Sequence, residues 1–294
     1  MQNEADVHVG ERPFRATTPP THGSPRSATS TRVDDAFYDV LARTERRHWW
    51  YSARREILAW AVASALESAP REGVLYDLGC GVGANLPMLA GFGTAVGVDT
   101  SEKALAYCRA RTGALALRAD LEKLTAIETD TARLVLLADV LEHLDDDESC
   151  LDAIRDLCKP EAALVITVPA FQALWGVNDL ASQHRRRYTA RTLTAVLAPR
   201  FAIERMTYFN SWLLPAIALS RWSERLRTPR PGAEGEVPPL FVNAALRGVL
   251  RSELTWLRRG RSFGAGVSLL AIARKRLCGV PARRLDASVG EACA

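Results

Sequence analysis

The sequence lacks the cysteine patterns of a metal finger or a disulfide framework. Its six cysteines are scattered and none forms a CxxC pair, whereas disulfide-dense proteins are usually small secreted domains. We therefore expect reduced thiols at Cys80, Cys108, Cys150, Cys158, Cys278 and Cys293.

Long apolar runs and a strong net charge are also missing. No run approaches the ~20 residues of a membrane-spanning helix, and the first residues show no apolar segment typical of a secretory signal. The net charge is only +4 over 294 residues, too small by itself to indicate a nucleic-acid partner. We expect a cytoplasmic protein.

What the sequence does have is a clear alternation of helical and apolar segments. Hydrophobic residues make up 48% of the chain, enough for a full core. Helical stretches over residues 33–47 and 54–66 precede short apolar runs separated by further helices, a pattern that predicts a parallel sheet covered on both faces. The expected strands are 74–78, 95–98, 115–117, 134–138, 163–168, 201–209 and 266–273.

Composition divides the chain into one folded region and irregular segments. Residues rich in Pro, Ser, Thr, Gly and Arg predict a disordered tail and an internal loop. The expected boundaries are a tail at 1–33, a domain at 34–277 with an exposed loop at 228–239, and a loose tail at 278–294. Within the domain we expect a helical cap at 34–70, a ligand-binding core at 71–210 and a helical lid inserted at 211–262.

A glycine-rich loop, Asp77-Leu-Gly-Cys-Gly-Val-Gly-Ala-Asn85, follows the first expected strand. Glycines let a ligand approach the backbone closely, and the start of the next helix offers free N–H groups. The spacing also fits the GxGxx(G/A) pattern of dinucleotide-binding proteins, with Asp99 at the distance of a ribose-binding acid. A nicotinamide-dependent oxidoreductase therefore remains an alternative at this point.

Acidic residues that follow successive expected strands argue against the oxidoreductase alternative. The segments DLGCGVGAN, VGVDTS, RADLEKL and LLADVLEHLDDD, in this order, resemble class I S-adenosylmethionine-dependent methyltransferases. The resemblance implies a doubly wound, mostly parallel, seven-stranded Rossmann-like α/β fold and S-adenosylmethionine as cofactor. It places the methionine end of the cofactor near Asp77, the ribose on Asp99 and the adenine on Asp120. The full set it implies is Asp77, Gly79, Gly81, Gly83, Asn85, Asp99, Thr100, Asp120, Leu121 and Asp139.

Other segments resemble one bacterial subgroup of this family, over roughly residues 34–277. They are HWWY at 48–51 followed by two arginines, Leu-Trp at 174–175 with Asp179, HRRRY at 184–188, Glu253, and FGAGVSLL at 263–270. Ser262 stands where the subgroup usually has proline. Because one fold serves many reactions, this likeness indicates the reaction class better than the acceptor.

Candidate catalytic residues follow the fourth and fifth strands. A base is needed only when the acceptor carries a proton that must leave, and His143, His184 and Tyr188 are our candidates, although His143 equally suits a packing role. Asp139, Glu142 and His143 resemble DxxEH or ExxEH segments that hold a metal in a few methyltransferases. We expect a reaction without a divalent ion.

Two groups are candidates for contact with the acceptor. Trp49, Trp50 and Tyr51 suit either a cation–π contact with the sulfonium or a packing role. Arg186 and Arg187 suit either an anionic acceptor or a solvated helix cap.

A basic amphipathic helix is expected at 241–261, as a lid over a hydrophobic or lipid-linked acceptor or as a peripheral contact with the inner face of a membrane. We expect O- or N-methylation of a small molecule: a metabolite, a natural-product intermediate or a lipid-linked glycan precursor. RNA or DNA methylation is an alternative, but such enzymes usually carry an Asn/Asp-Pro-Pro-aromatic segment where this chain reads Asp-Val-Leu-Glu at 139–142. A non-catalytic cofactor-binding partner protein is a further alternative, and the intact glycine loop does not favour it.

Overall fold

A computed structural model describes residues 35–224 and 237–276 of the chain. The expected tails at 1–33 and 278–294, most of the expected loop at 228–239, and Cys278 and Cys293 lie outside the described residues. The four described cysteines are buried free thiols. Among the described helices, none is both long and apolar enough to cross a membrane.

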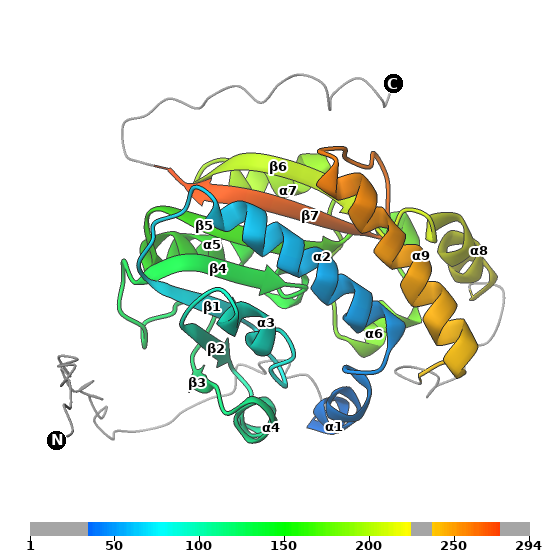
Figure 1. The fold of residues 1–294 in the computed structure, drawn as a ribbon, viewed down its shortest axis with the longest axis horizontal. Helices are drawn as coiled ribbons and strands as arrows, with labels where there is room; N and C mark the ends of the chain where they lie inside the picture. Colours follow the sequence, from blue (N-terminus) through cyan, green and yellow to red (C-terminus); the bar gives the residue numbers. More distant parts are fainter. Residues whose placement is uncertain (1–34, 225–236, 277–294) are drawn as a thin grey trace, which may run out of the picture. The chain divides into compact units, whose positions relative to one another are not determined.

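Seven strands form one sheet in the order β3-β2-β1-β4-β5-β7-β6 (Figure 1). β1 to β5 are parallel, and β7 lies antiparallel between β5 and β6. The prediction of a mostly parallel, seven-stranded sheet is confirmed. The strands are β1 Val74–Leu78, β2 Ala95–Asp99, β3 Leu115–Arg118, β4 Ala132–Ala138, β5 Cys158–Pro169, β6 Phe201–Phe209 and β7 Ser268–Lys275.

Helices cover both faces of this sheet. On one face, α2 (Trp49–Leu66) crosses the strands beside α9 (Leu240–Arg258), while α3 (Leu86–Ala90) lies against β2 and α4 (Glu102–Thr112) against β2 and β3 (Figure 1). The opposite face carries α5 (Asp147–Leu157) and α7 (Ala190–Leu197).

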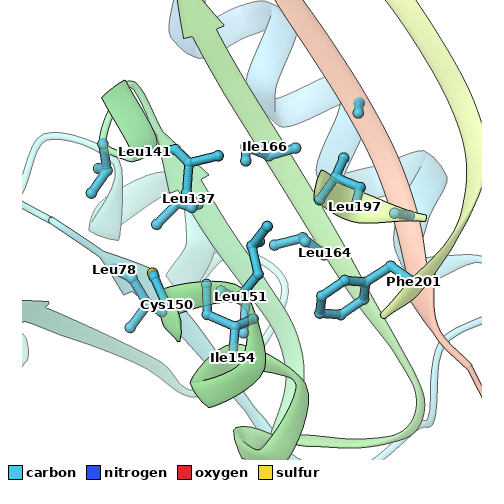
Figure 2. Packing of buried hydrophobic residues seen from close by; sticks show 14 of the residues in the cluster. Leu78, Leu137, Leu141, Cys150, Leu151, Ile154, Leu164, Ile166, Leu197 and Phe201 are labelled. Atoms are coloured by element: carbon cyan, nitrogen blue, oxygen red, sulfur yellow. The ribbon is translucent and has the colours of Figure 1, made fainter. Parts of the chain in front are cut away.

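The α5–α7 face has a continuous apolar core (Figure 2). Leu151 and Ile154 of α5 and Leu197 of α7 are fully buried among side chains of β4 and β5 such as Leu137 and Ile166. Each buried leucine or isoleucine contributes about 1.5–3 kcal/mol. This packing fixes the two strands whose ends carry the histidine candidates.

Helix α2 begins earlier than the periodicity predicts. The His48 ring accepts a hydrogen bond from the Trp50 backbone N–H at 3.3 Å and so caps the helix, a role that serine, threonine or aspartate more often fills. The aromatic segment at 49–51 therefore forms the first turn of α2. Before it lies α1, Asp35–Thr44, within the expected helix at 33–47.

The insertion between β6 and β7 is helical, as expected, and consists of α8 (Leu214–Glu224) and α9. The buried Glu253 carboxylate of α9 accepts hydrogen bonds from the backbone of Asn210, Ser211 and Trp212 at 2.6–2.9 Å. At Gly266 a Cβ would lie 2.4 Å from the Phe209 carbonyl oxygen, so only glycine fits. Glu253 and Gly266, which both belong to the segments that resemble the subgroup, therefore anchor the insertion to the end of β6.

Candidate active site

The glycine loop after β1 has a backbone that other residues adopt poorly. Gly79, Gly81 and Gly83 all have positive φ, at 72°, 51° and 84°. A Cβ on Gly79 would lie 2.4 Å from Cγ2 of Val140, the residue that leads from β4 into the turn η1 (Leu141–His143). The loop therefore packs directly against the chain that follows β4.

Asp99, at the end of β2, faces this loop. Its two carboxylate oxygens accept backbone hydrogen bonds from Gly81 at 2.8 Å and Ser101 at 2.9 Å. Burial raises its pKa, although these bonds oppose the shift. A carboxylate has about four acceptor positions, so both oxygens can accept further hydrogen bonds from a ligand.

Asp77, at the end of β1, is almost completely buried, and its Oδ2 has no hydrogen-bond partner among the described residues. Burial raises its pKa to about 8, although a hydrogen bond with Asn85 opposes the shift. A buried acceptor without a partner is costly. A cationic ligand at this position would relieve that cost.

The remaining predicted cofactor residues lie at the same edge with different exposure. Asp120 and Thr100 are exposed, and Leu121 is buried in the core. The Asp120 Oδ1 accepts a hydrogen bond from the backbone N–H of Glu122 at 3.0 Å. The Asp120 carboxylate is thus accessible at the end of β3.

Helix α1 lies over the glycine loop. Leu41 is 3.7 Å from the position of a Gly81 Cβ, and Tyr38 packs against Val82. Asp39 ties α1 to α4 through Lys103 at 2.9 Å and Tyr107 at 2.7 Å. This arrangement agrees with the expected helical cap.

Asp139 is engaged within the protein rather than open to a ligand. Its carboxylate forms an ion pair with the buried Arg54 of α2 and accepts the Thr167 hydroxyl hydrogen bond at 3.0 Å. Burial alone would lower the pKa of Arg54, but Asp139, Tyr51 and Glu45 raise it above its ordinary value. Arg54 therefore joins α2 to the end of β4, and the predicted role of Asp139 toward the cofactor has a competing internal partner.

The aromatic segment mainly packs. Trp50 stacks on Phe209 of β6 with centroids 5.7 Å apart and an interplanar angle of 2°. The Trp49 backbone N–H donates to the Asn243 side chain of α9 at 2.8 Å. Burial raises the pKa of Tyr51 to about 12. For Trp50 and Trp49 the geometry favours the packing alternative.

Three side chains meet beside the end of β4, and we call them the Glu–His cluster: Glu142, His143 and His184. One ligand atom from each lies within 4.8 Å of the others, and the two imidazole rings meet edge to face at 4.7 Å. Burial raises the pKa of Glu142 well above its ordinary value and, together with His184, lowers that of His143 to about 4. The structure thus brings two of the three predicted catalytic residues together.

Asp179 supports this cluster from α6 (Val177–Ala181). Its carboxylate bonds the His184 Nδ1 at 2.8 Å and pairs with Arg187 through two bonds of 2.8 and 3.0 Å. Burial favours a higher pKa for Asp179, but the hydrogen bonds with His184 and Arg187 outweigh it and lower the pKa to about 2. Asp179 is therefore a carboxylate that orients a candidate catalytic imidazole.

Arg186, Arg187 and Tyr188 are all held by partners within the protein. Arg187 has 6% of its side chain exposed and also donates to the Ala170 carbonyl at 2.8 Å. Arg186 bonds the Leu144 and Asp145 carbonyls and pairs with Asp147. The buried Tyr188 hydroxyl donates to Asp147 at 2.8 Å. These internal partners compete with the predicted contacts of Arg186 and Arg187 with an acceptor and with the predicted catalytic role of Tyr188.

Sequence reasoning gave no role to two residues that organise the site, Arg54 and Asp179, and named Glu142 only in the metal alternative. Arg54 and Asp179 belong to the subgroup segments. Their partners, Asp139 and His184, lie 85 and 5 residues away along the chain. Spacing could flag the residues but could not reveal their partners.

Comparisons with known proteins agree with this geometry. Residues 76–166 match the family model described as a methyltransferase domain. No curated protein matches the chain significantly. Among solved structures, the PH0226 protein from Pyrococcus horikoshii OT3 is similar with a TM-score of 0.54, 14% identity, and coverage of 82% of this chain and 99% of that one.

Two further structures are similar at the level of fold. A chain of the complex between the Haloferax volcanii Trm112 methyltransferase activator and a candidate methyltransferase has a TM-score of 0.51 and 17% identity, covering 86% of this chain and all of that one, 100%. The other is geranyl diphosphate C-methyltransferase from Streptomyces coelicolor A3(2), solved with Mg²⁺, geranyl-S-thiolodiphosphate and S-adenosyl-L-homocysteine. Its TM-score is 0.50 and its identity 13%, over 75% of this chain and 76% of that one.

The sheet order and the acids fit S-adenosylmethionine better than a nicotinamide dinucleotide. Classical dinucleotide-binding sheets have the strand order 3-2-1-4-5-6, whereas here the antiparallel β7 separates β5 from β6. The unpartnered Asp77 oxygen suits the ammonium of the methionine end, and Asp99 retains acceptor positions for ribose hydroxyls. The chain therefore contains a class I S-adenosylmethionine-dependent methyltransferase domain.

Proposed function

We propose that the protein transfers the methyl group to an oxygen or nitrogen atom of a small-molecule acceptor. The observation that supports the proposal is the position of the Glu–His cluster. It lies at the carboxyl edge of the sheet, close to the glycine loop at which we expect the cofactor. Val140 connects the glycine loop with the Glu–His cluster, since it contacts the loop and stands three residues before His143. An acceptor group between the loop and the cluster would lie next to both the methyl donor and the polar side chains of the cluster.

The reaction itself asks the protein mainly for alignment and exclusion of water. S-adenosylmethionine supplies an electrophilic methyl group on a sulfonium. Asp77 and Asp99 would hold the methionine and ribose ends of the cofactor, and α1 would cover the glycine loop. Precise orientation of two reactants is worth about 7–11 kcal/mol of the barrier in favourable cases. A hydroxyl acceptor also needs to lose a proton, and the Glu–His cluster is the group of polar side chains that would bind the acceptor oxygen and favour that loss.

The acceptor is proposed to be a hydrophobic or lipid-linked small molecule rather than an anion. The guanidinium groups of Arg186 and Arg187 are engaged by the protein's own carboxylates. By contrast, α8 and the residues before it expose large apolar side chains, namely Trp212 at 52%, Leu219 at 64% and Trp222 at 59%. These side chains lie in the insertion that we expect to act as a lid.

Partition of a radiolabel tests the proposal directly. The full chain is incubated with S-adenosylmethionine labelled in the methyl group and a cell extract, which is then separated into low-mass aqueous, organic-soluble, nucleic-acid and protein fractions. We expect label in the organic-soluble or low-mass fraction and its loss in a His143→Ala and His184→Ala double variant. Label in RNA or DNA would instead support the nucleic-acid alternative.

A further inference from the structure

The Glu–His cluster has the composition of a metal site. Its members come from two segments that are far apart in sequence: Glu142 and His143 lie on η1 after β4, and His184 follows α6. One oxygen and two ring nitrogens lie within 4.8 Å of one another. Two imidazoles and one carboxylate are a donor set that divalent transition metals take in proteins.

Glu142 is the strongest indication that a ligand belongs here. Its side chain is completely buried, yet neither carboxylate oxygen has a hydrogen-bond partner among the described residues. The His184 Nε2 lies 3.9 Å from Oε1, too far for a hydrogen bond. Buried carboxylates are normally paired or bound to a metal, so this one lacks the partner that its position requires.

Both histidines are oriented as metal-binding histidines are. Such a ring usually gives its second nitrogen to a carboxylate or a backbone carbonyl, which fixes the ring and its tautomer. The His184 Nδ1 bonds the Asp179 carboxylate at 2.8 Å, and this leaves Nε2 on the side of Glu142. The His143 ring bonds the Ser182 backbone, and its Nδ1 is buried without a partner among the described atoms.

Arg187 completes this support. It holds the Asp179 carboxylate through two hydrogen bonds, so the carboxylate that orients His184 is itself fixed. The HRRRY segment at 184–188 thus supplies one candidate ligand and the clamp behind it. Asp139, which the sequence suggested as a third ligand, is paired with Arg54 instead, and His184 takes that place.

We propose that Glu142, His143 and His184 bind one divalent transition-metal ion, such as Zn²⁺, Mn²⁺, Fe²⁺ or Co²⁺. Three protein ligands leave positions open, as in catalytic rather than structural zinc sites. His184 has 15% of its side chain exposed, so the site is accessible. The proposal replaces our expectation of a metal-free site, and it does not depend on the identity of the acceptor.

Direct metal binding tests it without any assay of methyl transfer. The full chain is stripped with a chelator, dialysed and titrated with Co²⁺ and with Zn²⁺, following heat by calorimetry and the visible absorption of bound Co²⁺. We expect one ion per chain. Glu142→Gln, which preserves the shape of the side chain, and His184→Ala should each abolish the absorption. Asp179→Asn should weaken binding by about 10–100-fold, as loss of a group that orients a ligand does.

Two control variants have matched chemistry but lie outside the cluster. His48→Gln removes a half-buried imidazole at the start of α2, and Glu148→Gln removes an exposed carboxylate of α5. Both should retain metal binding. Circular dichroism of every variant establishes that it is folded.

Two results would overturn the proposal. One is a stripped wild-type chain that binds neither ion. The other is a folded Glu142→Gln variant that binds Co²⁺ as tightly as wild type, because the ion would then lie elsewhere in the chain.

Discussion

The two halves of the sheet's carboxyl edge are built in different ways. At the β1–β2 half, Asp99 is held by backbone N–H groups of its own turn and of the neighbouring glycine loop. At the β4–β5 half, side chains hold one another, as Arg187 holds Asp179 and Asp179 holds His184. A binding site made of backbone depends on local spacing, whereas one made of side chains depends on which segments the fold brings together.

The largest effect is expected at Arg187, in the half built from side chains. Arg187→Ala leaves the fully buried Asp179 without its main partner, and breaking a buried ion pair costs about 3–5 kcal/mol. Urea unfolding at pH 7 measures this loss. Arg185→Ala, in the same segment, is the control: its side chain is 34% exposed and pairs with an aspartate that is 71% exposed, so the loss should stay below about 1 kcal/mol. Equal losses would remove the distinction between the two arginines.

The second largest effect is expected at Gly79, in the β1–β2 half of the edge, where backbone groups form the binding site. Gly79 and Gly113 have similar φ values of 72° and 65°, but a Cβ meets Val140 only at Gly79, and nothing lies within 4 Å at Gly113. Each alanine variant should lose about 1 kcal/mol of stability because of its positive φ. Gly79→Ala should lose about 1–3 kcal/mol more through the clash with Val140. Only this variant should also weaken S-adenosylmethionine binding, by ~30-fold or about 2 kcal/mol, because relief of the clash displaces the loop. Calorimetry would contradict this if both variants bound the cofactor equally well.

A smaller effect is expected where the insertion begins its second helix. Leu240 and Phe241 of α9 are 88% and 77% exposed, and we propose that they contact a membrane surface. Replacing both with serine should lower co-sedimentation with anionic vesicles by about fivefold, or about 1 kcal/mol, because partly inserted side chains contribute only a fraction of the about 1.5–3 kcal/mol of full burial. Val249→Ser, at a position that is 37% exposed, is the control. Absence of binding by the wild-type chain would refute the membrane contact.

The smallest effect is the release of less than one proton per chain when the cofactor binds. Because the pKa of Asp77 is raised to about 8 by burial, its carboxyl is mostly neutral at pH 7, and a cofactor ammonium beside it would lower that pKa. Cofactor binding at pH 7 should therefore release protons, seen as different apparent heats in buffers of different ionisation enthalpy. Asp77→Asn should abolish the release, whereas a release that persists in this variant would have another origin.

The raised pKa of Asp77 also predicts how the stability of the cofactor-free protein depends on pH. Its folded pKa lies above the ordinary value of 3.8, so the neutral form is favoured by folding. That contribution is fully present below about pH 4 and is lost as the pH rises toward 8. The unfolding free energy of Asp77→Asn should change less over this range than that of wild type.

The contrast between the halves also explains what could be predicted from the sequence. The expected strand at 201–209 is confirmed, and Asp77 and Asp99 lie at the ends of β1 and β2 as expected, because apolar periodicity and glycine spacing are local signals. The internal partners of the arginine run could not be predicted, because these carboxylates come from α5, α6 and the turn before α5. Likewise, the ion pair between Asp139 and Arg54 joins residues that lie 85 positions apart in the sequence.

The most direct test of the account is whether the two halves bind different molecules. Calorimetry compares S-adenosylmethionine and NAD on wild type, Asp99→Ala and His184→Ala, each verified as folded. We predict that wild type binds S-adenosylmethionine and not NAD, that Asp99→Ala weakens this by ~10–100-fold through lost hydrogen bonds to a charged group, and that His184→Ala changes it by less than about threefold, under 1 kcal/mol. Binding of NAD alone, or an equal loss in both variants, would contradict the account.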